Sequence, residues 1–135
     1  MKKILILIIP IFLTGCLGEA GKGYITKECK KIETINGNKI ETNIKIKSKQ
    51  GNIETITIQE TYEKNMNLES ITNSKKSEQN LFKQTTGASL NIDNNIFIYE
   101  INKQEASELI IQKFNIKDEQ HEQIKYYENN GYACK

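Results

Sequence analysis

The residues of this chain with the most versatile chemistry are its three cysteines, Cys16, Cys29 and Cys134. A deprotonated thiol can attack a carbon centre, pair into a disulfide or bind a metal ion. His121 is the only histidine and no Cys-x-x-Cys spacing occurs, so the sequence does not favour a metal site. Attachment of a diacylglyceryl lipid and disulfide formation are therefore the two reactions that we expect of these thiols.

The position of Cys16 indicates lipidation. Two lysines precede an apolar run that ends at Leu13. A membrane-spanning helix needs about 20 apolar residues, and this run is about half as long, which is typical of a secretory signal. Leu13-Thr14-Gly15-Cys16 resembles the lipobox of bacterial lipoproteins, whose small residues let a peptidase reach the backbone. We therefore interpret residues 1–15 as a lipoprotein signal peptide. The other interpretation is a short core helix that contains a cysteine by chance.

A lipidated Cys16 would hold the protein permanently on a membrane. One acyl chain anchors a protein only marginally, whereas diacylglyceryl and N-acyl chains such as palmitate together give a stable anchor. Residues 16–23 then read as the lipidated cysteine and a flexible tether, because three glycines fall in residues 17–23. The expected location is the extracytoplasmic face of the cell membrane, or an outer membrane if the source has one.

Length and charge limit what the remaining residues 24–135 can be. They suffice for one ordinary domain but not for a two-lobed solute-binding protein. The chain has 19 basic and 17 acidic residues, so without Lys2 and Lys3 the two signs balance at 17 each. A neutral domain argues against nucleic acid as a partner. Every basic residue is a lysine, so the planar fork that arginine offers to phosphates and carboxylates is missing.

Cys29 and Cys134 remain once Cys16 is assigned to a lipid. An even pair in an exported protein favours a disulfide, which would close a loop of just over 100 residues. The alternative is two free thiols, one buried and one on a frayed terminus.

The first half of the domain has the pattern of an antiparallel sheet. Strands are predicted over Tyr24–Ile35, Lys39–Ser48 and Ile53–Glu63, with Asn36-Gly37 as a hairpin turn. Apolar and polar residues alternate cleanly in the second strand, so one face should meet the core and the other should meet water.

The second half mixes helix and strand signals. We expect a weakly amphipathic helix over Ser74–Thr85 and strand character over Ser89–Ile101, with a turn or bulge at Asp93-Asn94-Asn95. Asn102 can cap a further helix, and another is expected from Lys117. The predicted fold is α+β, a two-layer sandwich with about four antiparallel strands and two or three helices on one face.

The strand that carries Cys29 and the ending Tyr126 to Cys134 resemble the YehR-like lipoprotein family, above all in the spacing of Tyr127, Gly131 and Cys134. The resemblance implies a two-layer α/β sandwich over residues 24–135 and supports the pairing of Cys29 with Cys134. It carries no catalytic residue over to this chain.

Other candidate residues are weaker. His121 lies among acidic and amide side chains, so a solvated helix face is a better interpretation than a catalytic base. Glu54, Glu60 and Glu63 could form an acid/base pair, but scattered glutamates on a strand are usually solvated.

Three tyrosines near the end of the chain, Tyr126, Tyr127 and Tyr132, could form an aromatic recognition patch. We expect them instead to cap the core and shield the disulfide.

These observations predict a membrane-anchored, non-enzymatic binding or interaction module. Its expected contacts are the membrane, through Cys16, and a protein at the cell surface. No cofactor, metal or nucleic acid is expected. The alternative function is an accessory enzyme or inhibitor in cell-envelope metabolism. A concave pocket with converging polar groups would indicate a ligand-binding or enzymatic role, and a flat apolar face would indicate a protein partner.

Overall fold

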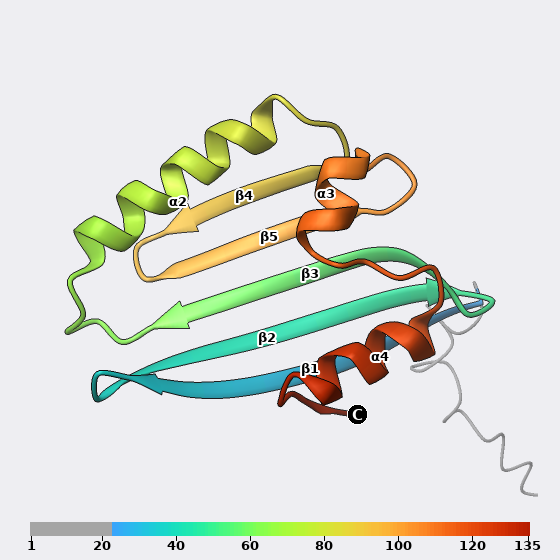
Figure 1. Ribbon diagram of the computed structural model, residues 1–135, viewed down its shortest axis with the longest axis horizontal. Helices are drawn as coiled ribbons and strands as arrows, with labels where there is room; N and C mark the ends of the chain where they lie inside the picture. The colour runs from blue at the N-terminus through green and yellow to red at the C-terminus, as the bar shows by residue number, and fades with distance from the viewer. Residues whose placement is uncertain (1–22) are drawn as a thin grey trace, which may run out of the picture.

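The computed structural model describes residues 23–135 and begins with a meander of three long strands (Figure 1). These are β1 (Tyr24–Ile35), β2 (Asn38–Lys49) and β3 (Asn52–Tyr62). Asn36 and Gly37 both have positive φ, at 52° and 81°, as a two-residue hairpin turn requires. The three predicted strands and their first turn are confirmed. The predicted signal peptide and Cys16 lie outside the described residues.

The sheet has six strands among the described residues, so the expectation of about four was wrong. The strand order is β4-β5-β3-β2-β1-β6, and every neighbouring pair is antiparallel. The predicted strand Ser89–Ile101 is a hairpin of β4 (Ala88–Asp93) and β5 (Ile96–Asn102), because Asn94, with φ of 51°, makes a full turn. Strand β6 (Ala133–Cys134) is too short to produce a periodic pattern.

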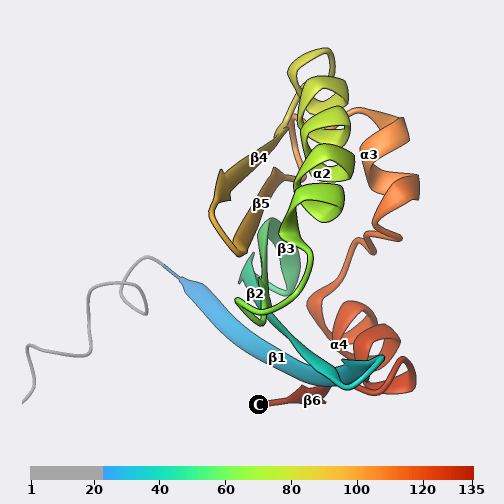
Figure 2. The same ribbon diagram turned by 90° about the vertical axis from the view of Figure 1, so that its left-hand side faces the viewer.

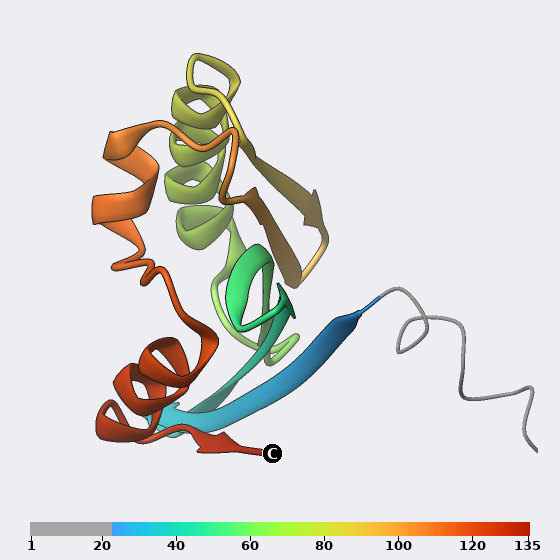
Figure 3. The same cartoon turned by 90° about the vertical axis from the view of Figure 1, so that its right-hand side faces the viewer.

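All three helices of the described chain lie on one face of the sheet (Figures 2 and 3). They are α2 (Leu68–Lys83), α3 (Glu108–Lys113) and α4 (Gln120–Asn129). The α+β class is therefore confirmed. None of these helices is long and apolar enough to cross a membrane.

Three helix starts differ from the sequence-based expectation, and α4 begins at Gln120, three residues after Lys117. Helix α2 begins six residues before Ser74. Asn102 caps no helix: it forms a turn in which Ala106 N–H donates to the Asn102 carbonyl at 2.9 Å, and α3 begins only at Glu108, after Ser107. The turn satisfies the same backbone groups that a helix start would have used. The residues after Asn102 therefore form the hydrogen bonds of a helix cap, but the chain makes only one turn there.

The core lies between the helices and the covered face of the sheet, called here the inner face. Directly opposed residues form rows across the strands, and one buried row runs Cys29, Ile44, Ile58, Tyr99 and Leu90. The helices close this core with Phe82, Ile110 and Tyr127.

Helix α4 is fixed to one end of the sheet by a buried glutamine. The Gln120 side-chain amide donates to the Ile46 carbonyl at 3.1 Å, and its backbone N–H donates to the Gly51 carbonyl at 2.8 Å. These bonds satisfy polar groups that would otherwise be buried without partners. They fix the position of α4, and therefore of its tyrosines, relative to the sheet.

Cys29 and Cys134 form a disulfide that joins β1 to β6. Cys29 is 1% exposed, and backbone hydrogen bonds between Glu28 and Lys135, at 3.1 and 2.9 Å, flank the link. The disulfide interpretation is confirmed over that of two free thiols. Because β6 has only two residues, the covalent link is the main restraint on the C-terminal end of the chain.

Replacing both cysteines, Cys29→Ala with Cys134→Ala, should lower the free energy of unfolding by about 3–5 kcal/mol, since the unfolded chain gains the freedom of a large loop. Chemical unfolding followed by circular dichroism measures this change. A reductant should destabilise the unmodified protein and leave the double variant unchanged. An unmodified protein whose unfolding midpoint ignores the reductant would contradict the prediction.

Candidate binding groove

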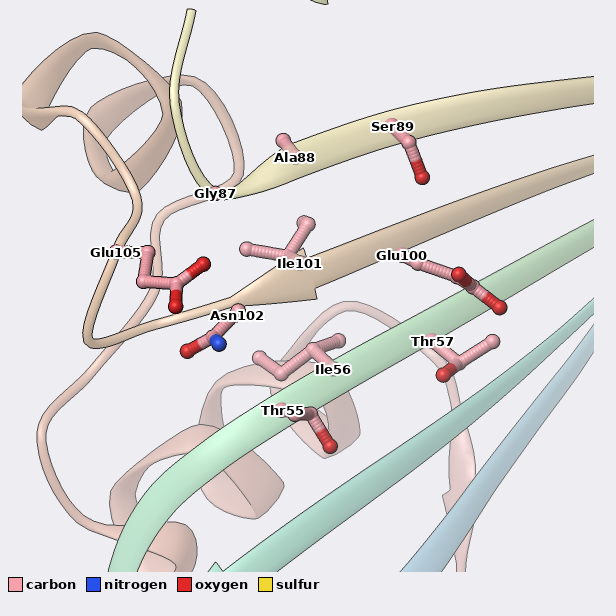
Figure 4. A pocket seen from close by; sticks show the side chains of 10 residues that line it. All are labelled: Thr55, Ile56, Thr57, Gly87, Ala88, Ser89, Glu100, Ile101, Asn102 and Glu105. Atoms are coloured by element: carbon pink, nitrogen blue, oxygen red, sulfur yellow. The ribbon is translucent and has the colours of Figure 1, made fainter.

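Two of the hollows on the described surface lie against the sheet near its centre, one on each face. The outer hollow has a volume of about 460 Å³ and lies where β3, β5 and β4 meet the loop after β5 (Figure 4). Thr57, Glu100 and Ser89 are directly opposed in register there. No aromatic ring and no lysine lines this hollow. It offers hydroxyls and carboxylates on the uncovered face of the sheet.

The inner hollow, called here the inner groove, has a volume of about 320 Å³. Helix α2 packs on β4 while α4 packs on β2 and β6 (Figure 1), and the groove is lined by residues of both helices and of the strands between them. The lining residues are Thr42, Ile44, Ile58, Glu60, Lys75, Glu78, Tyr99, Lys113, Phe114, Tyr126, Tyr127 and Tyr132. This groove brings together charged side chains and aromatic rings, so it is the stronger candidate site.

Lys75 is the centre of the charged wall of the groove. Its ammonium lies 2.8 Å from a carboxylate oxygen of Glu60 and 3.7 Å from one of Glu78. It also donates a hydrogen bond to the Tyr99 hydroxyl. The Lys75 side chain is only 16% exposed, so it depends on these partners for its solvation. A cation thus separates two carboxylates that would otherwise repel each other.

A second lysine completes the charged wall, and two tyrosines donate hydrogen bonds to its carboxylates. The Tyr99 hydroxyl donates to Glu78 at 2.8 Å, and the Tyr62 hydroxyl donates to Glu60 at 3.1 Å. The Lys113 ammonium lies 3.1 Å from the other oxygen of Glu78. Every ionised group of this wall therefore has an opposite charge or a hydroxyl within reach.

These contacts shift the pKa values of the groups involved. Burial would raise the pKa of Glu78, but hydrogen bonds from Tyr99 and Lys113 and the charge of Lys75 outweigh burial and hold that pKa below its ordinary value of 4.5. Burial raises the pKa of Tyr99, and the negative charge of Glu60 raises it further. Tyr99 therefore stays a neutral hydrogen-bond donor while Glu78 stays ionised.

The opposite wall is aromatic. The ring centroids of Tyr126 and Tyr127 lie 5.4 Å apart, and those of Tyr127 and Tyr132 lie 5.3 Å apart. Tyr127 is 5% exposed and belongs to the core, while the other two rings are half-buried at its sides. Burial raises the pKa of the Tyr127 hydroxyl, the neighbouring Tyr132 and Tyr126 raise it further, and a contact with Gln123 lowers it.

The tyrosines pack on the core as expected, and their role as a recognition patch stays a prediction. Tyr127 caps the core, and Tyr132 packs against it together with Cys134, as expected for a cluster that shields the disulfide. All three rings also line the groove, as a recognition patch would. The same three rings therefore border the core and line the groove.

Of the other predicted site residues, Glu60 lines the groove, whereas His121 and Glu54 lie outside it. His121 is 75% exposed and lies 3.0 Å from Glu119, on the solvated face of α4. Glu54 accepts a hydrogen bond from Gln104 at 3.0 Å. No group of three or more histidines, cysteines or carboxylates within residues 23–135 could hold a metal ion.

Sequence reasoning missed Lys75, Glu78, Tyr99 and Lys113 as members of a site. A signal for two of them was present: Lys75 and Glu78 fall on the same helical stripe as Ile71 and Phe82, so helix α2 must turn both charges towards the sheet. The alternation of β3 likewise places Glu60 on the inner face with Ile58. Charges on an inward stripe are the feature that marks the groove.

Lys75→Met should lower the free energy of unfolding by about 1–3 kcal/mol, because it leaves two half-buried carboxylates close together without their shared cation. Lys76→Met is the matched control, since Lys76 is the exposed neighbour on the same helix. Urea unfolding at neutral pH measures both variants. Equal changes in the free energy of unfolding for the two variants would show that the ion pairs of Lys75 do not stabilise the fold.

The stability of the protein should fall as the pH drops below 4.5, in part because Glu78 takes up a proton. Its pKa is lower in the folded than in the unfolded chain, so its ionised form stabilises the fold above 4.5, and this contribution is lost as the pH falls through the folded pKa. Glu78→Gln should flatten the acid side of the stability curve measured by thermal unfolding. Glu105→Gln, at an exposed loop position, should keep the slope of the unmodified protein.

No known family model, no curated protein and no solved structure matches this chain. The resemblance to YehR-like lipoproteins stays a prediction from the residues quoted for it. What the protein does must therefore be argued from the chemistry of the groove.

Proposed function

We propose that this protein is a membrane-anchored, extracytoplasmic binding module that holds a small ligand in the inner groove. One observation carries the binding part of this proposal: the helix-covered face of the sheet contains an open hollow lined by four charged side chains and four tyrosines. A helix-covered face is normally closed with apolar side chains, since buried charge costs stability. A fold that keeps such a hollow open on that face is organised to bind.

The location rests on the sequence. The apolar run before Leu13-Thr14-Gly15-Cys16 and the resemblance to YehR-like lipoproteins support lipidation of Cys16 and an extracytoplasmic position. The Cys29–Cys134 disulfide supports the same position, because disulfides persist in oxidising compartments. A groove within reach of the membrane surface would meet ligands of the cell envelope first.

A binding role fits the groove better than the alternative of an accessory enzyme or inhibitor. An enzyme of acyl or glycosyl transfer needs a nucleophile or base that is free to react. The lysines and glutamates of the groove are engaged with one another at 2.8 to 3.7 Å. Their mutual pairing supports a static recognition surface.

The anchor is tested by expressing the full chain and a Cys16→Ser variant in a bacterial host that processes lipoproteins. The unmodified protein should sediment with membranes and partition into detergent, and its mass should match cleavage before Cys16 plus attached acyl chains. The variant should lose the lipid mass and the detergent partitioning. An unmodified protein without lipid mass would overturn the proposed anchoring.

A further inference from the structure

The charged side chains that line the inner groove cancel one another. Lys75 and Lys113 carry the positive charges, and Glu60 and Glu78 carry the negative ones. A ligand of single charge would have to displace one member of an existing ion pair, which costs the remaining partner its counter-ion. The absence of arginine from the chain removes the planar fork that most favours phosphates and carboxylates. The groove is therefore suited to a ligand without net charge.

The two walls of the groove offer different chemistry to such a ligand. Tyr126 and Tyr132 provide aromatic surface on one side, and the charged wall around Glu78 provides strong donors and acceptors on the other. A sugar ring has the matching shape, with a face of C–H groups and a rim of hydroxyls. The rings can cover the apolar face while the charged side chains bond the hydroxyls.

An extended peptide fits the groove less well. Peptides that bind to sheets usually pair with the backbone of an exposed edge strand. The floor of the groove is the face of β2 and β3, and each of these strands already has a hydrogen-bonded strand on both sides. No free strand edge is therefore offered to a peptide there.

The size of the groove limits the ligand to one or two rings. Its volume of about 320 Å³ lies at the small end of the range of about 300–1,000 Å³ that is typical of small-molecule pockets. Lys113 is 39% exposed at the rim and can reach a longer ligand that extends beyond the hollow. A terminal or internal unit of a short oligosaccharide would satisfy both conditions.

We propose that the inner groove binds the ring of a neutral carbohydrate, with one face of the sugar against Tyr126 and Tyr132 and its hydroxyls towards Glu78 and Lys113. This inference rests on the proposed function and names the class of ligand for the same groove.

The test is a titration of the mature, ¹⁵N-labelled protein in detergent micelles, followed by NMR. The probes are cellotriose, triacetylchitotriose and, as a neutral non-sugar, a capped tetraalanine peptide. At least one of the two sugars should cause saturable shifts at millimolar concentration, and these shifts should be confined to residues of the groove.

Two matched variants test the aromatic wall. Tyr126→Leu should weaken sugar binding by about fivefold to tenfold, since it removes a stacking ring, whereas Tyr126→Phe keeps the ring and should bind about as well as the unmodified protein. Comparison of the free NMR spectra shows whether both variants remain folded.

The outcomes separate the inference from the function that it rests on. Saturable shifts in the groove with the peptide but with neither sugar would overturn the carbohydrate assignment and leave the binding function standing. Sugar-induced shifts outside the groove would also overturn the assignment. No shift in the groove with any of the three probes would overturn both.

Discussion

The placement of Lys75 between Glu60 and Glu78 is the interaction on which the rest of the inner face depends. A half-buried ammonium must be surrounded by acceptors, and these two carboxylates come from different elements, β3 and α2. Their shared cation therefore ties the helix to the sheet at a fixed distance. All three charged groups line the groove, so the same contact that joins the helix to the sheet also forms one wall of the groove.

The positions and diameters of the helices explain where the groove lies. Helix α2 has 16 residues and α4 has 10, and they pack on opposite ends of a six-stranded sheet. Helix α3, with six residues, covers only a corner beside α2 (Figure 1). Two helices of about 10 Å diameter cannot cover six strands spaced about 4.8 Å apart, so a strip of the inner face remains between them. The fold itself thus provides the hollow, and the side chains decide what it accepts.

The sequence predicted an element correctly where its local pattern agreed with the burial of its residues. The meander of β1, β2 and β3 was predictable because alternation and the Asn36-Gly37 turn indicated the same structure. The start of α2 was not, because Lys75 and Glu78 occupy inward positions and weaken the apolar period on which helix prediction relies. The site was missed for the same reason, since charges were assumed to face water. The resemblance supported the pairing of Cys29 with Cys134 but said nothing of the groove.

The disulfide has a consequence for how the protein responds to proteolysis. Cys29 and Cys134 enclose almost the whole folded chain between them. A protease that cuts once inside this span would separate the backbone into two pieces that remain covalently joined. If Cys16 carries the anchor, the nicked protein would stay attached to the membrane as one body. Release of a fragment would then require a second cut or a reducing agent. A single cut would therefore not lower the number of protein molecules held on the membrane.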